Sequence, residues 1–282
     1  MTRRSGPIYV LGAASMPGWS LLRHPAGNRL VPFGGARAKA PASRGWRRFN
    51  LEDGGAYARL FAGEPPRALV HCGGVCDVEK CEAHPAWARA VNVESLGYLL
   101  ACLPAATRLV YISSDHVFSG RRRAYDERSR PSPLTEYGRL RVAAERLILK
   151  KRPDALVLRY ALCVGPSSGG RTGHLDWLRY RTRRGLPITL VRDEYRSAVR
   201  AEDLARRILA YVDSAAAGIR HIAAAAVSRP ELAEYLNRRF RIGARFTLVS
   251  RADRPVPHLG RVELATVYRD ALAAPLPAVV RA

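Results

Sequence analysis

Apolar runs that alternate with helical patterns, from the N-terminus as far as Tyr160, constrain the fold of this 282-residue chain more than any other feature. Successive strands separated by helices pair in parallel, with helices covering both faces of the sheet. The expected strands are residues 8–11, 29–33, 68–72, 108–113 and 155–160. The expected helices are residues 19–24, 56–62, 85–103 and 133–151. The pattern therefore predicts an α/β fold with a doubly wound parallel sheet.

The regular alternation of strand and helix patterns ends after residue 165. Residues 165–173 are rich in glycine and serine and are predicted to form a loop. Helical patterns follow at residues 175–184, 201–214 and 230–240, mixed with shorter elements. We therefore expect a first domain at residues 1–165 and a smaller α/β lobe at residues 166–282, some elements of which return to the first domain.

The turn after the first strand reads Gly12-Ala-Ala-Ser15-Met-Pro-Gly18. A Rossmann-type domain has a glycine-rich turn here, because the backbone approaches the pyrophosphate of a dinucleotide and the amides of the next helix meet its charge. Ser15 replaces the middle glycine of a G-x-x-G-x-x-G pattern; its hydroxyl can either cap the helix or bond a phosphate oxygen. With Met16, these residues predict a site for NAD or NADP.

The end of the second strand bears on the choice between the two dinucleotides. Enzymes that prefer NAD usually have an acidic residue there, which binds the ribose hydroxyls. This chain has Gly34-Gly35-Ala36-Arg37 instead. Arg37 can meet a 2′-phosphate, so NADP is favoured over NAD.

A hydroxyl, a phenol and a cation form a candidate catalytic group. Ser114 ends the strand at residues 108–113, Tyr137 begins the helix that follows, and Arg141 lies one turn later on the same face. A cation beside a phenol favours the phenolate and lowers its pKa. The alternative is structural: a capping hydroxyl, a half-buried tyrosine and a solvated arginine near Glu145.

Several motifs in order resemble the extended short-chain dehydrogenases/reductases, most closely the dTDP-4-dehydrorhamnose reductase group, over nearly the whole chain. The residues that carry the resemblance, besides the phosphate turn, are 71–82 (an Ala-rich loop under the cofactor), 90–92, 113–120 (S-T-D-Y-V-F-D-G in the family), 125–138 (Y-x-E…P…Y-G), 191–193 and 202–205.

The resemblance implies roles for the catalytic group. Tyr137 would be the general acid in the reduction of a sugar ketone, and Ser114 would bond the substrate carbonyl. Arg141 stands where the family has a lysine that contacts the nicotinamide ribose; arginine keeps the charge but cannot release a proton. Two further departures are His116 in place of tyrosine and Ser119 in place of aspartate.

The same resemblance implies that Cys72, Gly73, Gly74 and Asn92 belong to the cofactor site, with Tyr137 and Arg141, and that the smaller lobe binds the substrate. Two functions remain open. The first is an NAD(P)-dependent reductase of a nucleotide-linked 4-keto sugar or a similar carbonyl. The second is a non-catalytic relative that binds a dinucleotide as a binding or regulatory subunit, a reading motivated by Ser15, the early helix break at Pro25, His116 and Arg141.

The net charge of +23 is the most unusual bulk property. Of the 47 basic residues only Lys39, Lys80, Lys150 and Lys151 are lysines, a skew spread along the whole chain. Such a surface attracts polyanions generically. Because no DNA- or RNA-binding signature is present, we expect no specific nucleic-acid partner.

Location and metal content follow from the remaining composition. No secretory signal and no run near the about 20 apolar residues of a membrane span are present, so we expect a cytoplasmic protein that does not bind membranes. The five cysteines are expected to be free thiols. Those near His71 and His84 lack paired zinc-ligand spacing, so no metal site is expected. A homodimer is left open.

Overall fold

A computed structural model describes residues 6–35, 45–63 and 65–281. Its centre is a seven-stranded sheet in which every neighbouring pair of strands is parallel. The strands, in sheet order, are β11 (Gly218–His221), β7 (Leu156–Tyr160), β5 (Arg108–Ser114), β4 (Ala68–His71), β1 (Ile8–Leu11), β2 (Leu30–Gly34) and β3 (Arg47–Arg48). The predicted α/β fold with a doubly wound parallel sheet is confirmed.

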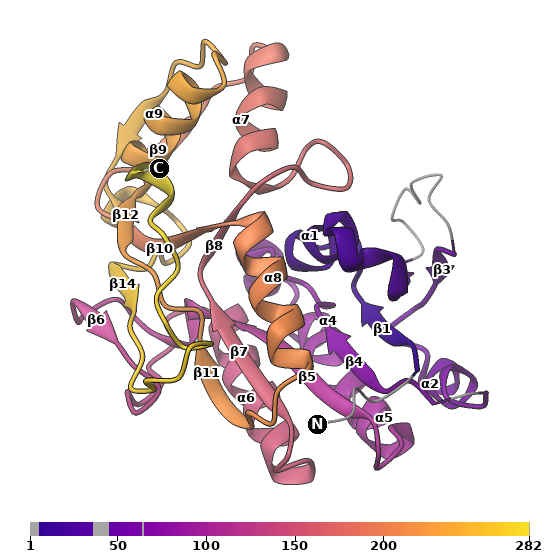
Figure 1. Cartoon of the computed structure of the whole chain (residues 1–282). Helices are drawn as coiled ribbons and strands as arrows, with labels where there is room; N and C mark the ends of the chain where they lie inside the picture. The colour runs from indigo at the N-terminus through magenta and orange to yellow at the C-terminus, as the bar shows by residue number, and fades with distance from the viewer. Residues whose placement is uncertain (1–5, 36–44, 64, 282) are drawn as a thin grey trace.

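Helices cover both faces of this sheet (Figure 1). The helices of one face are α1 (Met16–Arg23) and α8 (Ala201–Val212), and those of the other are α2 (Gly54–Leu60), α5 (Ser95–Cys102) and α6 (Glu136–Lys151). Side chains of a strand alternate between the faces. Val10 accordingly packs in the core under α1 and α8, and Leu11 packs in the core under α2, α5 and α6.

Two of the predicted helices differ in detail from the observed ones. Helix α1 begins at Met16, earlier than predicted, because Ser15 caps it, and a 3-10 turn at Pro25–Arg29 follows it. The predicted helix at residues 85–103 is α4 (Pro85–Arg89), a π-helical turn at Ala90–Glu94, and α5. Such π turns occur often at functional sites.

A short helix, α3 (Val78–Ala83), was not predicted. The Asp77 side chain caps it by accepting a hydrogen bond from the Lys80 amide. The helix lies in the segment that the family resemblance identified as a loop under the cofactor. Its first turn, after the cap, brings Cys81 into the protein interior.

The smaller lobe contains a second sheet. Its strands, in order, are β12 (Ala226–Ser228), β10 (Tyr195–Arg200), β14 (Arg261–Leu264) and β6 (Ala124–Tyr125), and β8 (Leu162–Val164) also pairs with β10. A two-stranded sheet joins β9 (Thr189–Val191) and β13 (Thr247–Val249), and the helices are α7 (Gly173–Arg183) and α9 (Arg229–Arg239). The chain crosses between the lobes in both directions: β6 joins the second sheet, and β11 and α8 join the first.

Two further observations concern the described part of the chain. None of its helices combines the length and apolar character needed to cross a bilayer. All five cysteines are free thiols, as expected.

Candidate functional site

A cavity of about 530 Å3 opens at the carboxyl ends of β1, β4 and β5. Parallel sheets bind ligands at this edge. Eight of the predicted cofactor residues line the cavity: Gly12, Ser15, Met16, Cys72, Gly73, Gly74, Tyr137 and Arg141. Of the others, Gly18 and Asn92 lie behind the lining, Ser114 lies beside Tyr137, and Arg37 is outside the described residues.

The turn between β1 and α1 requires glycine at its first position. Gly12 has φ +76°, and a Cβ there would lie 2.3 Å from the backbone nitrogen of Gly73. The Ser15 hydroxyl accepts a hydrogen bond from the Gly18 amide at 3.2 Å. Of the two roles that the sequence left open for Ser15, the structure therefore has the helix cap. Met16 and Pro17, the first residues of α1, line the cavity. Pro17 has no N–H and the Gly18 amide is bonded to Ser15, so of these first three residues Met16 offers its amide to an anion at the positive end of the helix.

The loop after β4 forms the opposite wall, and Asn92 holds it in place. The Asn92 side chain accepts from the Val75 amide at 2.9 Å and donates to the Val75 carbonyl at 3.0 Å. Gly74 has φ +130°, and a Cβ there would lie 2.3 Å from Asn92 Oδ1. Asn92 is thus a positioning residue for the loop, supplied by the π-helical turn.

Tyr137 lies in the first turn of α6, which Thr135 caps. The ring is 7% exposed and meets the His116 ring edge-to-face at 5.2 Å. Burial raises the pKa of Tyr137 above its usual value of 10.0, while Arg141 and the Ser114 hydroxyl oppose this shift. The predicted lowering of this pKa is therefore wrong, because desolvation of the phenolate outweighs the neighbouring cation.

Arg141 is buried, being 5% exposed, so the solvated-helix alternative does not hold. Its Nη1 donates to the Tyr111 hydroxyl at 2.6 Å, and its guanidinium lies 5.0 Å from the centroid of the Tyr137 ring. Nε has no hydrogen-bond partner among the described residues. The Tyr111 contact was not predicted; the signal available in the sequence was a tyrosine on the strand that ends at Ser114.

Glu145, which the alternative placed beside Arg141, belongs to another ion pair. Both of its oxygens accept from Arg159, at 2.9 and 2.6 Å, and Ser113 donates to Oε1 at 2.5 Å. Glu145 and Arg159 are both fully packed inside the protein. This pair joins α6 to β5 and β7 below the site.

His71 and His116 flank the two tyrosines. The His71 ring lies 5.6 Å from the Tyr111 ring, and neither of its nitrogens has a partner among the described residues. Burial lowers the pKa of His71 to about 3 and that of His116 to about 4. Both imidazoles are therefore neutral near pH 7.

A buried charge network begins at Asp115, next to Ser114. Arg196 binds both carboxylate oxygens of Asp115, with Nε to Oδ2 at 2.6 Å, and its Nη1 lies 3.3 Å from Glu194. The other oxygen of Glu194 accepts from His258 at 2.7 Å. This network was not predicted, because its members are far apart in the sequence.

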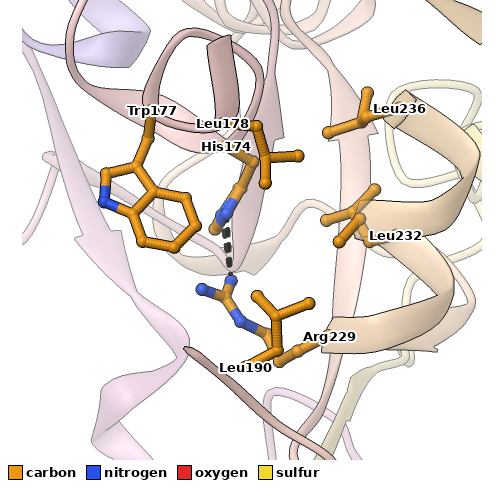
Figure 2. A pocket seen from close by; sticks show the side chains of 8 residues that line it. His174, Trp177, Leu178, Leu190, Arg229, Leu232 and Leu236 are labelled. Atoms are coloured by element: carbon orange, nitrogen blue, oxygen red, sulfur yellow. Dashed lines mark hydrogen bonds between the residues drawn. The ribbon is translucent and has the colours of Figure 1, made fainter. Parts of the chain in front are cut away.

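A small pocket in the smaller lobe, shown in Figure 2, lies beside this network, because its Arg229 interacts with Glu194, Arg196 and Asp115. Arg229 at the start of α9 meets the His174 ring of α7 at 3.1 Å, and Trp177 and Leu190 form its apolar wall. Burial and Arg229 lower the pKa of His174, so its imidazole is neutral. In the described residues, no group of three or more histidines, cysteines or acids is arranged to hold a metal ion.

The family description "RmlD substrate binding domain" matches residues 6–261. Three curated relatives are similar over part of the chain. A probable low-salt glycan biosynthesis reductase of Haloferax volcanii is 30% identical over 57% of this chain and 55% of its own length. A dTDP-4-dehydrorhamnose reductase of Streptomyces griseus is 31% identical over 68% and 63%, and methionine adenosyltransferase 2 subunit beta of Bos taurus is 30% identical over 56% and 47%. The chain therefore spans about half to two thirds of these relatives.

Among solved structures, the dTDP-4-dehydrorhamnose reductase of Bacillus anthracis in complex with NADP superposes with a TM-score of 0.81. The alignment covers 98% of this chain and 96% of that one, at 18% sequence identity. At this identity the likeness concerns the fold.

Proposed function

Because the chain belongs to the RmlD substrate binding domain family, we propose that it is a reductase that uses NADPH or NADH to reduce a nucleotide-linked 4-keto sugar or a similar carbonyl. One observation carries this proposal: Tyr137 and Arg141 line the same cavity as the phosphate turn at Gly12 and Ser15. A proton donor and a dinucleotide site thus share one space. The family resemblance inferred from the motifs is confirmed by the family match.

The residues present fit a dinucleotide. The backbone around Gly12 and Gly74 is packed so closely that a Cβ would fill the cradle, and the start of α1, at Met16, lines the cavity. Gly12, Ser15 and Met16 would hold the pyrophosphate, and Cys72, Gly73 and Gly74 would border the rest. When bound, the nicotinamide supplies the hydride.

Two residues bear on the choice of dinucleotide: Arg37, which follows β2 in the sequence and lies outside the described residues, and Glu52. Arg37 favours NADP, and we keep NADP first. Glu52, which sequence reasoning missed, lines the cavity and offers a carboxylate for ribose hydroxyls, so it favours NAD. The ratio of the dissociation constants of NADPH and NADH, measured for the wild type and for Glu52→Gln, tests this assignment.

In the proposed reaction the Tyr137 hydroxyl donates its proton to the carbonyl oxygen. The Ser114 hydroxyl, which donates to Asp115 Oδ1 at 3.1 Å in the structure, would turn to donate its hydrogen bond to the same carbonyl oxygen. The raised pKa of Tyr137 keeps the proton on the phenol at neutral pH. An alkoxide is more basic than a phenolate, so the transfer remains favourable. Arg141, held above the Tyr137 ring, stabilises the phenolate that results.

The test is a stopped assay of NADPH oxidation against a panel of 4-keto nucleotide sugars. Tyr137→Phe should lower kcat by about 100-fold or more, because it removes the general acid. Tyr9→Phe is the matched control, since the Tyr9 hydroxyl has no hydrogen-bond partner among the described residues. Equal activity of Tyr137→Phe and wild type would contradict the mechanism.

The second candidate is a non-catalytic subunit that binds a dinucleotide. It is favoured by the engagement of Arg141 with Tyr111 and by the similarity to a protein named as a subunit. Under this reading, wild type binds NADPH, as measured by nicotinamide fluorescence, but oxidises none of it with any sugar. Turnover that appears only in Arg141→Lys would place the loss of activity at this side chain. Wild-type turnover that Arg141→Ala abolishes supports the reductase.

A further inference from the structure

A second cavity, of about 920 Å3, is lined by residues of α1, α7, α8 and α9. Figure 1 shows α1 and α8 on the central sheet and α7 and α9 in the smaller lobe. This second cavity shares no lining residue with the cofactor cavity. Its size is that of a small-molecule site, since such sites usually enclose about 300–1,000 Å3. We call it the arginine cavity.

Positive charge dominates the lining of the arginine cavity. Its arginines and its single carboxylate are Arg23, Arg179, Arg200, Arg206, Arg239 and Glu202. They come from segments far apart in the sequence, so their convergence is a property of the fold. Arg179 and Arg206 pair with Asp176 and Asp203 of their own helices, whereas the exposed Arg23, Arg200 and Arg239 have no ion-pair partner within the described residues.

Two of the guanidinium groups are held in place by an aromatic ring. Phe240 is 39% exposed, and the guanidinium carbons of Arg179 and Arg239 lie 4.9 and 5.5 Å from its centroid. Cation–π contacts of this kind orient guanidinium groups. An oriented guanidinium presents a planar set of donors that matches the oxygens of a phosphate.

The start of α8 adds backbone donors to the same wall. Arg200 is the cap residue, and an arginine side chain cannot accept a hydrogen bond from the first amides of a helix. Ala201, the first residue of α8, lines the cavity. The positive end of the helix lies beside the arginines, and Glu202 and Asp203 in its first turn offset part of that charge.

The floor of the arginine cavity is apolar. Val164, Leu175 and Leu236 line it and belong to the core of the smaller lobe. A ligand with an organic part, as well as one made only of phosphates, can be accommodated there.

From the cavity, its unpaired arginines and the helix start, we propose that the arginine cavity binds a ligand with two or more linked phosphate groups, separately from the dinucleotide. The phosphate chain is the recognised chemistry. This phosphate chain can belong to a nucleoside diphosphate or to an inorganic polyphosphate. Comparing the affinities of the two kinds of ligand distinguishes these sources.

The experiment is isothermal titration calorimetry with tripolyphosphate, ADP and adenosine, with and without saturating NADPH. The titrations contain about 150 mM salt, because this concentration screens interactions between exposed charges that are more than about 8 Å apart. Without NADPH, tripolyphosphate can occupy both the cofactor cavity and the arginine cavity. With NADPH filling the cofactor cavity, one saturable site should remain, and adenosine alone should not bind. ADP that binds tighter than tripolyphosphate identifies a nucleotide as the source, and ADP that binds no tighter identifies the phosphate chain alone.

A variant with Arg23→Gln, Arg200→Gln and Arg239→Gln should weaken tripolyphosphate binding roughly tenfold or more, because each removes charge-assisted hydrogen bonds. The control removes the same charge elsewhere, with Gln at exposed residues 121–123, and should change affinity less than about twofold. Thermal unfolding checks that both variants are folded. An equal loss in both variants, or unchanged tripolyphosphate affinity in the variant at Arg23, Arg200 and Arg239, overturns the proposal.

Discussion

Replacing Tyr111 by phenylalanine tests the contact that distinguishes this site. The change removes the one hydroxyl that accepts from Arg141 Nη1, at 2.6 Å, in a place closed to solvent. Nε of Arg141 already has no partner among the described residues, so the buried cation becomes still less satisfied. The loss of a hydrogen bond to a charged group costs about 1.5–3 kcal/mol. The midpoint temperature of thermal unfolding should therefore fall by roughly 2–4 °C for each kcal/mol of stability that is lost.

A double-mutant cycle separates this contact from general loss of packing. Arg141→Met alone removes the cation, and the double variant with Tyr111→Phe replaces both partners by apolar groups. We expect a coupling free energy of about 1.5–3 kcal/mol between the two positions, measured by urea unfolding. Tyr9→Phe, as control, should change stability by less than about 0.5 kcal/mol. Additive effects of the two substitutions would refute the assignment of Tyr111 as the residue that holds Arg141.

Three further outcomes are expected. Gly12→Ala should abolish NADPH binding as measured by nicotinamide fluorescence, whereas Gly63→Ala, outside the cofactor cavity and with no atom within 4 Å of the new Cβ, should keep it; retained binding in Gly12→Ala would contradict the turn. Gly97→Ala, on the exposed side of α5 with open space around the new Cβ, should raise the free energy of unfolding by about 0.5–1 kcal/mol, and a fall in urea midpoint would contradict this. The folded-state pKa of His71 is lowered to about 3, so the contribution of the neutral imidazole to the free energy of unfolding is complete above pH 6.5. This contribution is lost as the pH falls towards 3, by at most about 1.4 kcal/mol per pH unit. His71→Leu should therefore reduce the dependence of the urea midpoint on pH across that range, and an unchanged dependence would show that other groups cause it.

Local sequence patterns determined the central sheet, the phosphate turn and the family of this protein. The alternation of strands and helices predicted the central sheet, because strand and helix periodicities are properties of neighbouring residues. The turn at Gly12 was also readable, since its glycine spacing reflects a backbone path that few other residues permit. The ordered motifs around Ser114 and Tyr137 identified the family, which the family match confirms.

Tertiary structure decided what the pattern could not. The sign of the Tyr137 pKa shift depends on how completely the phenol is desolvated, and that follows from packing rather than from the cation one turn away. The hydrogen bond from Arg141 to Tyr111 joins a helix to a strand 30 residues earlier in the chain. The arginine cavity likewise exists only because α1, α7, α8 and α9 meet. A composition rich in arginine predicts charge, but only the fold determines which charges face one another across an empty volume.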